Sequence, residues 1–166
     1  MNRLIFLAIL LLLNFVSANE LPYNYQDTTS IPIELNVFNE LSSKDEIYEG
    51  QEINLRVKND VVYNNKVIVS KGTIAKTKIE TIVTKGMNGF PAEIILDNFK
   101  IDGIKDSQLI SKYKKAGRNF AILIYPIKWA LTPIPFVGSL TNLIHGGEAK
   151  IKETDVITIQ YYPNWK

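Results

Sequence analysis

Residues 61–83 read VVYNNKVIVSKGTIAKTKIETIV and consist of strand-like runs separated by turn signals. Asn64 and Asn65 readily adopt left-handed backbone conformations, so VVYNNKVIV is typical of a β-hairpin. Gly72 then separates this hairpin from a longer run over residues 73–83. Apolar and polar residues alternate along these runs, which indicates antiparallel strands with one buried and one exposed face.

The same alternation continues on both sides of this region, in residues 31–38, 53–58 and 92–101. Strands at this spacing, bounded by glycine, proline and asparagine, are typical of sandwiches and barrels. We therefore predict an all-β fold, an antiparallel β-barrel or β-sandwich of about 6–8 strands with one apolar, helical insertion. We expect residues 31–166 to form this single domain, after a flexible lead-in over residues 19–30.

Residues 1–18 have the parts of a secretory signal peptide. Arg3 supplies a positive charge, residues 4–16 are apolar except for Asn14, and small residues precede a cleavage point after Ala18. An uncleaved anchor is the alternative, but the apolar run is shorter than the roughly 20 residues of a bilayer span. The sequence therefore predicts export to the periplasm or cell envelope.

The apolar stretch 119–144, NFAILIYPIKWALTPIPFVGSLTNLI, is unusual because Lys128 is its only charged residue. Gly117 and Gly146 bracket it, as expected for an insertion between strands. A continuous transmembrane helix is disfavoured, because Lys128 would lie near mid-membrane and proline breaks a helix; the prolines are Pro126, Pro133 and Pro135. Two interpretations remain: a broken helix or helical hairpin that covers an open end of the barrel, or an excursion that contacts a membrane or a protein partner.

Trp129, Ile134 and Phe136 are the predicted contact residues of this stretch, because buried aromatic side chains dominate interface energetics. A basic cluster directly precedes the stretch and comprises Lys112, Lys114, Lys115 and Arg118. Such a flank can attract anionic lipid, at about 1 kcal/mol per charge near a surface. The alternative is an ordinary solvated loop. The candidate partners are an envelope protein, a membrane surface and a second copy of the chain.

Sequence signals for catalysis or cofactor binding are lacking. The chain has no cysteine and one histidine, His145, which no G-x-S-x-G elbow accompanies. Basic and apolar residues separate Asp97, Asp102 and Asp106, unlike the ligands of an EF-hand loop. The formal net charge of +2 gives no footprint for nucleic acid. We therefore predict a protein that is not an enzyme and binds no metal, cofactor or nucleic acid.

The order of these segments resembles the C-terminal β-barrel domain of TrbI-type conjugation proteins, the scaffold of type IV secretion systems. The similar elements are NNKVIVSKGTIAKTKI, AEIILDNFKIDG, the stretch 119–144 and AKIKETDVITIQYY. The motif Lys71-Gly72-Thr73 is also similar to that of uncharacterised exported bacterial β proteins. The resemblance implies a barrel from which an apolar helical insertion projects toward the outer membrane. Family members usually add a cytoplasmic segment, an inner-membrane span and a proline-rich linker, whereas this sequence begins with the signal-like segment.

These observations favour an exported, non-enzymatic envelope protein that acts as a structural or interaction module. In this hypothesis, the stretch 119–144 contacts a partner or a membrane. The alternative is a carrier of a small ligand or lipid, with the same stretch as a lid over the barrel mouth.

Overall fold

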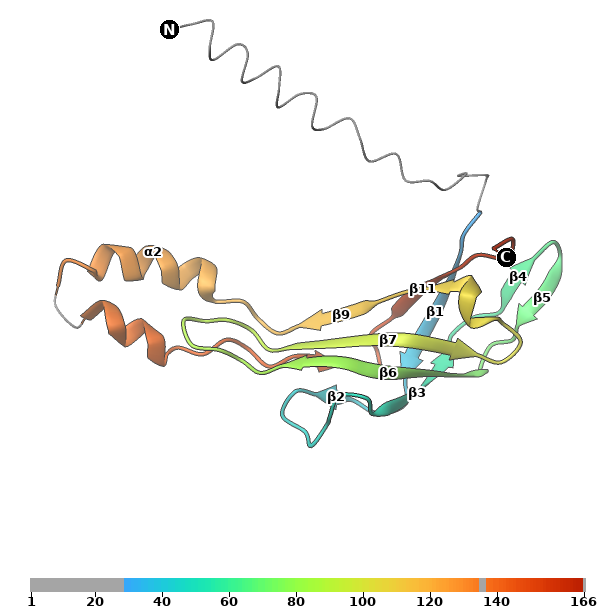
Figure 1. Cartoon of the computed structure of the whole chain (residues 1–166), viewed down its shortest axis with the longest axis horizontal. Coiled ribbons are helices and arrows are strands. Elements are labelled where there is room, and N and C mark those ends of the chain that lie inside the picture. The colour runs from blue at the N-terminus through green and yellow to red at the C-terminus, as the bar shows by residue number, and fades with distance from the viewer. Residues whose placement is uncertain (1–28, 135–136, 166) are drawn as a thin grey trace, which may run out of the picture.

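A single curled sheet dominates the computed structural model, which describes residues 29–134 and 137–165 (Figure 1). The predicted signal peptide and most of the lead-in lie outside the described residues. The main strands are β1 (Ile31–Val37), β3 (Glu52–Val57), β6 (Ile74–Val83), β7 (Glu93–Ile101), β8 (Leu109–Ile110), β9 (Tyr113–Ala116) and β11 (Ile157–Tyr161). They form one seven-stranded antiparallel sheet in the order β8-β11-β1-β3-β6-β7-β9.

Shorter elements complete the fold. Two small ladders pair β2 (Leu41–Ser42) with β10 (Lys150–Ile151) and β4 (Val61–Tyr63) with β5 (Lys66–Val69). The helical elements are η1 (Asp106–Gln108), α2 (Ala121–Leu131) and η2 (Val137–Leu143). The predicted all-β class with one helical insertion is confirmed, and the sheet takes the form of a strongly curled half-barrel.

The turn between β4 and β5 explains why residues 61–69 fold back on themselves. Asn64 and Asn65 have φ values of +50° and +58°, the left-handed conformation that a tight hairpin turn requires. The predicted hairpin is therefore confirmed.

Strand β6 shows the alternation that the sequence predicts, with Ala75, Thr77 and Ile79 buried between exposed neighbours. Its register with β7 shifts between Lys76 and Lys78, opposite Asn98, which has a φ of +61°. Such bulges bend a strand and increase its twist, so they help the sheet to curl. The core fills the concave side of the curl; fully buried members include Ile33, Leu35, Leu55, Ile94, Leu96, Ile157 and Ile159.

The curl brings the two edges of the sheet together. Strand β8 pairs with β11, and β9, which follows β8 after only Ser111 and Lys112, pairs with β7. Lys115 of β9 donates a hydrogen bond of 2.7 Å to Asp155, in the turn before β11. This ion pair lowers the pKa of the Asp155 carboxyl and raises that of the Lys115 ammonium. It therefore helps to hold the seam between the edges.

We expect the free energy of unfolding of Asp155→Asn to fall less between neutral and acid pH than that of the unsubstituted protein. Because the pKa of Asp155 is lowered in the fold, the ion pair stabilises the protein above the pKa of an unfolded aspartate, about 4. This contribution disappears as the pH falls through the lowered, folded-state pKa. At neutral pH the substitution should cost up to about 1 kcal/mol. Urea unfolding at neutral and acid pH measures both effects.

The control for this prediction is Asp106→Asn, which breaks the ion pair of Asp106 with Lys100. Both side chains of that pair are more than half exposed, so its loss should cost less than that of the seam pair. Equal losses at neutral pH, or an unchanged acid dependence of Asp155→Asn, would contradict the role given to the seam pair.

Candidate contact surface on the helical arm

The apolar stretch forms a helical arm, which we define as residues 121–134 and 137–143, the described residues that hold α2 and η2. It leaves the sheet after β9, returns toward β10, and extends beyond the sheet along the long axis of the molecule (Figure 1). The Asn119 side chain accepts a hydrogen bond of 2.9 Å from the Ala121 N–H and so satisfies a donor at the start of α2. The predicted helical insertion is therefore present, and α2 and η2 lie beyond the end of the sheet and do not cover it.

The neck, which we define as residues 86–92, 117–120 and 144–147, joins the arm to the sheet. Its three segments are tied by main-chain hydrogen bonds: the N–H of Gly89 donates to Ile144, and that of Phe120 donates to Gly89. The N–H of Gly117 donates to Ala92, and that of Gly147 to Arg118. This ladder continues the sheet into the base of the arm and fixes the arm's direction.

Glycine is required in the neck because the backbones approach one another closely. A Cβ atom on Gly146 would overlap the Phe90 carbonyl group, and one on Gly117 would overlap the Gly147 carbonyl group. At Gly89 a Cβ would lie 2.6 Å from the Ile124 side chain. The glycines that bracket the stretch in the sequence thus serve to bring three backbone segments together.

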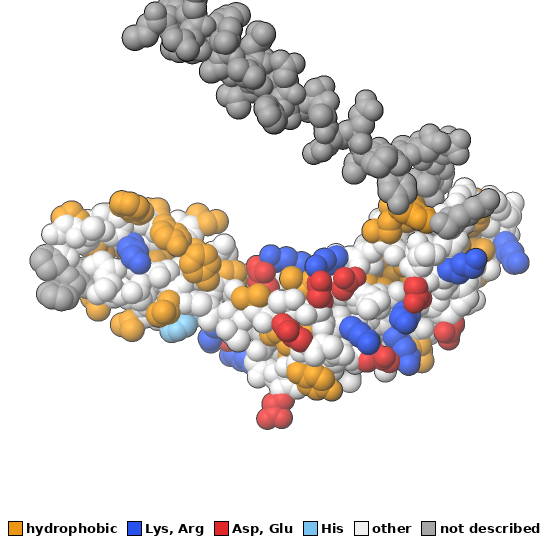
Figure 2. Space-filling model, viewed as in Figure 1, with side chains coloured by type: hydrophobic (Ala, Val, Ile, Leu, Met, Phe, Trp, Pro, Cys, Tyr) orange, Lys and Arg blue, Asp and Glu red, His pale blue; other side chains and the backbone are white. Residues whose placement is uncertain are grey.

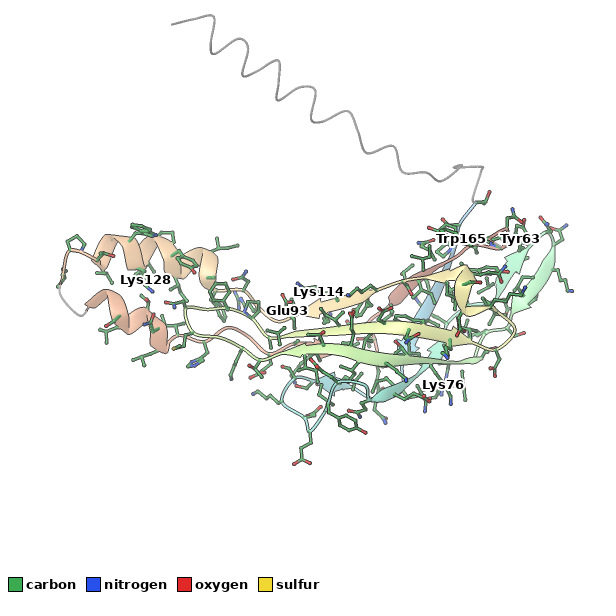
Figure 3. All side chains as sticks on the ribbon, viewed as in Figure 1. Tyr63, Lys76, Glu93, Lys114, Lys128 and Trp165 are labelled. Carbon is green, nitrogen blue, oxygen red and sulfur yellow. The ribbon has the colours of Figure 1, made fainter. Side chains whose placement is uncertain are left out.

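The one charged side chain of the arm, Lys128, lies between α2 and η2 and is partly exposed. Lys128 Nζ donates hydrogen bonds of 3.2 Å to the side-chain oxygens of Asn88, in the β6–β7 loop, and Asn142, in η2. The hydroxyl of Thr141, which is buried, lies 3.2 Å from the same Asn88 oxygen. Figure 3 shows Lys128 between α2 and η2. Ala121 and Ile124 are the buried apolar residues of α2.

The outer surface of the arm is apolar and exposed. Trp129 and Ile122 are each 74 % exposed, and Leu143 of η2 is 73 % exposed. Other large apolar side chains that are exposed on the arm are Leu123, Tyr125, Ile127, Ile134 and Leu140. Figure 2 shows apolar side chains gathered on the arm, with one basic side chain among them, and most of the charged side chains on the sheet. A contiguous exposed patch of this kind marks an interaction site in soluble proteins.

The predicted contact residues are only partly described. Trp129 and Ile134 lie exposed on the arm, whereas Phe136 lies outside the described residues. Sequence reasoning singled out two aromatic residues and Ile134 and did not name Ile122, Leu123 and Leu143, which are also exposed. Nearly every position of α2 is apolar, which leaves more apolar residues than one buried face can hold. This pattern could have pointed to Ile122 and Leu123.

The basic cluster faces carboxylates of the sheet. Lys112 pairs with Glu80 at 2.6 Å, Lys114 with Glu93 at 2.7 Å, and Lys115 with Asp155, as described above. The Glu80 carboxylate raises the pKa of Lys112, and Figure 3 shows Lys114 beside Glu93. Arg118 lies over the Phe120 ring at 5.2 Å. These partners reduce the net positive charge at the base of the arm, and attraction to anionic lipid stays a prediction.

Two surface hollows of the described chain lie away from the arm, on either side of Phe38. Each has a volume of about 480 Å³. The Arg56 guanidinium lies 4.4 Å from the centre of the Phe38 ring. The concave side of the sheet is filled by core side chains. This arrangement supports an external contact of the arm better than a lid over an internal ligand.

Within residues 29–134 and 137–165, no helix has the length and apolar character needed to cross a membrane. The same residues contain no cluster of histidine and carboxylate side chains suited to a metal ion. A scan against protein-family models, a search of curated proteins and a search of solved structures find no match for this chain.

Proposed function

We propose that this protein is an exported, non-enzymatic module of the bacterial cell envelope that makes contact through its helical arm. The curled sheet is the scaffold, and the arm is the contact element. The observation that carries the proposal is the exposure of large apolar side chains on both α2 and η2. Burying such a side chain is worth about 1.5–3 kcal/mol, so an arm left in water forgoes a large stabilisation.

The neck supports the role of the sheet as a scaffold. Main-chain hydrogen bonds join all three neck segments, and the Lys128 ammonium ties α2 to both Asn88 and Asn142. An arm fixed in this way loses little conformational freedom when it binds, which favours affinity. Export is proposed from the signal-like residues 1–18, and the N-terminal residue of the protein recovered from cells tests it.

A double substitution in the arm tests the proposed contact. We expect Leu123→Gln with Trp129→Gln to release the protein from the particulate fraction of expressing cells, with at least about a tenfold rise in the soluble share. Two lost apolar contacts of about 1.5 kcal/mol or more each weaken binding by roughly a hundredfold or more, so a tenfold rise is the lower bound. Because both side chains are more than half exposed, stability should change by less than about 1 kcal/mol. Fractionation and thermal unfolding give the two readouts.

The matched control is Val62→Gln with Val67→Gln, in the β4–β5 hairpin at the other end of the sheet. These side chains are also about half exposed, at 50 % and 49 %. The control should leave the distribution of the protein unchanged. An arm variant that distributes like the unsubstituted protein would overturn the proposal, and the mass of each recovered chain shows whether residues 1–18 were removed.

A further inference from the structure

We infer that the sheet carries a second docking surface, which binds an extended acidic segment of a partner protein as an added strand beside β3. This surface is separate from the arm, so its test does not depend on the contact proposed above. Three features carry the inference: unpaired main-chain groups on β3, a hollow that runs along them, and an arginine beside the hollow that has no carboxylate partner among the described residues.

Strand β1 covers only part of its neighbour β3. The pairing of β3 with β6 begins at Glu52, the first residue of β3, whereas the pairing of β3 with β1 stops at Val37, opposite Leu55. The chain then bends away from β3 through residues 38–40 and forms β2. We call the part of β3 that has no neighbouring strand on this side, Glu52–Asn54, the open edge.

The main-chain groups of Glu52 and Asn54 point toward this open side. In an antiparallel sheet, successive residues of a strand direct their N–H and C=O groups alternately to the two sides. The Lys58 N–H donates to the Glu34 carbonyl of β1, so Asn54 and Glu52, an even number of residues away, face the same side. In the described part of the chain, no main-chain hydrogen bond from residues 38–41 reaches them. These groups can therefore pair with an added strand.

One of the two hollows beside Phe38 runs along the open edge. It is lined by all three residues of the open edge, by Phe38 and Leu41 of the chain that leaves β1, and by Ile74 of β6. Its volume of about 480 Å³ lies within the range of ligand sites in proteins, and its apolar lining can take an apolar side chain. An extended segment placed here would continue the line of β1, antiparallel to β3.

The charge beside the hollow favours an acidic segment. The Arg56 guanidinium lies over the ring of Phe38, the residue that this hollow shares with the other one. Within the described ranges, Arg56 forms no ion pair with a carboxylate, whereas Glu52 is paired with Lys76 at 3.0 Å. A guanidinium binds a carboxylate through two parallel hydrogen bonds, so Arg56 favours an acidic side chain at its end of the open edge.

The register of the added strand sets the side chains that it would carry. A residue opposite Asn54 would point outward, like Asn54, and would lie diagonal to Arg56, so it would be acidic. The next residue, opposite Ile53, would point to the side on which Ile53 packs against the core, so it would be apolar. The third, opposite Glu52, would point outward beside a carboxylate, so it would be polar and uncharged. The partner segment therefore reads acidic, apolar, polar.

Peptides with single blocked amides test the added strand. The probe is a fluorescein-labelled peptide, Gly-Thr-Glu-Val-Thr-Thr-Gly, whose binding to the full chain is followed by fluorescence polarisation. N-methylation of the threonine directly after the valine removes the N–H that would donate to the Glu52 carbonyl, and it should weaken binding by at least about tenfold. N-methylation of the valine, whose N–H would point away from β3, is the matched control and should change binding by less than about threefold.

Two measurements on the protein locate the site. Saturating probe should slow the hydrogen exchange of the Glu52 and Asn54 amides by at least about tenfold and leave that of Ile53, which faces β6, unchanged. Arg56→Gln should weaken binding by about fivefold, whereas Lys66→Gln, which removes an exposed charge from β5, should have little effect. Replacing the glutamate of the probe by glutamine should weaken binding to the unsubstituted chain and not to Arg56→Gln.

Three results would overturn the inference. The first is no slowing of the Glu52 and Asn54 amides at about 1 mM probe. The second is an equal loss of binding for the two N-methylated probes, since the contact would then not run through the main chain of an added strand. The third concerns Asn54→Pro, which removes only an N–H on the open side and is tolerated at such an edge. If the unsubstituted chain is a dimer in solution and this variant is a monomer, a second copy covers the open edge instead of a partner segment.

Discussion

Gly146→Ala is expected to lower the free energy of unfolding by about 3 kcal/mol or more. Gly146 is buried in the neck, and a Cβ there would overlap the Phe90 carbonyl group and lie 2.5 Å from the Pro91 nitrogen. Both neighbours are backbone atoms, so no side chain can rotate away. The segments must separate instead, which weakens the hydrogen bond from Gly146 N–H to Gly86 and adds to the cost of overpacking.

Gly103→Ala is the matched control for this substitution. Gly103 has a φ of +88°, and nothing lies within 4 Å of a Cβ placed there. Its cost is therefore only that of a left-handed conformation, about 1–2 kcal/mol. Urea unfolding compares the two variants. Equal losses of stability in the two variants would contradict the close approach of backbones in the neck. Limited proteolysis is a second readout: if Gly146→Ala loses only the protease resistance of the arm, the arm and the sheet unfold separately.

Leu35→Ala is expected to cost about 2–5 kcal/mol, the range for large-to-small substitutions in a packed core. Leu35 is fully buried and lies in β1 where that strand pairs on both sides, opposite Ile157 of β11 and Val57 of β3. The cavity therefore opens among strands that surround it and cannot easily collapse. For a domain whose total stability is about 5–15 kcal/mol, this is a large share.

Val67→Ala provides the comparison for the core substitution. It removes the same kind of apolar surface from a side chain that is 49 % exposed, so its effect should be under about 1 kcal/mol. Denaturant unfolding midpoints measure both variants at constant slope. A small effect of Leu35→Ala would mean that the concave side of the sheet is not the packed core of the protein.

Much of the fold could be predicted because its signals are local. The alternation in residues 74–83 and the Asn64-Asn65 turn depend on neighbours in the sequence, and both predictions were confirmed. The two-residue strands β8 and β2 could not be predicted, because two residues show no periodicity. Residues 109–116 pair first with β11 and, after Ser111, with β7. This change of partner could not be predicted either, because it depends on the strong curl that brings the two edges of the sheet close together.

The candidate site was predicted less completely. The charge-free stretch and its bracketing glycines were visible, but the closeness of Gly146 to Phe90 depends on three segments that meet only in the fold. The carboxylate partners of Lys112 and Lys114 come from other strands, so sequence reasoning described a more positive flank than the structure has. The inward position of Lys128 depends on Asn88, forty residues away in the chain.

The direction of β6 gives the molecule the geometry of a spacer. Its ten residues run from the opposite end of the sheet toward the neck (Figure 1), a distance of about 33 Å at roughly 3.3 Å per residue. With the arm in contact with its partner, the start of β1 at that far end would stand about 30 Å from the contact. This distance exceeds the Debye length of about 8–10 Å at physiological salt. Charges at the far end of the sheet would therefore be screened from charges of the partner.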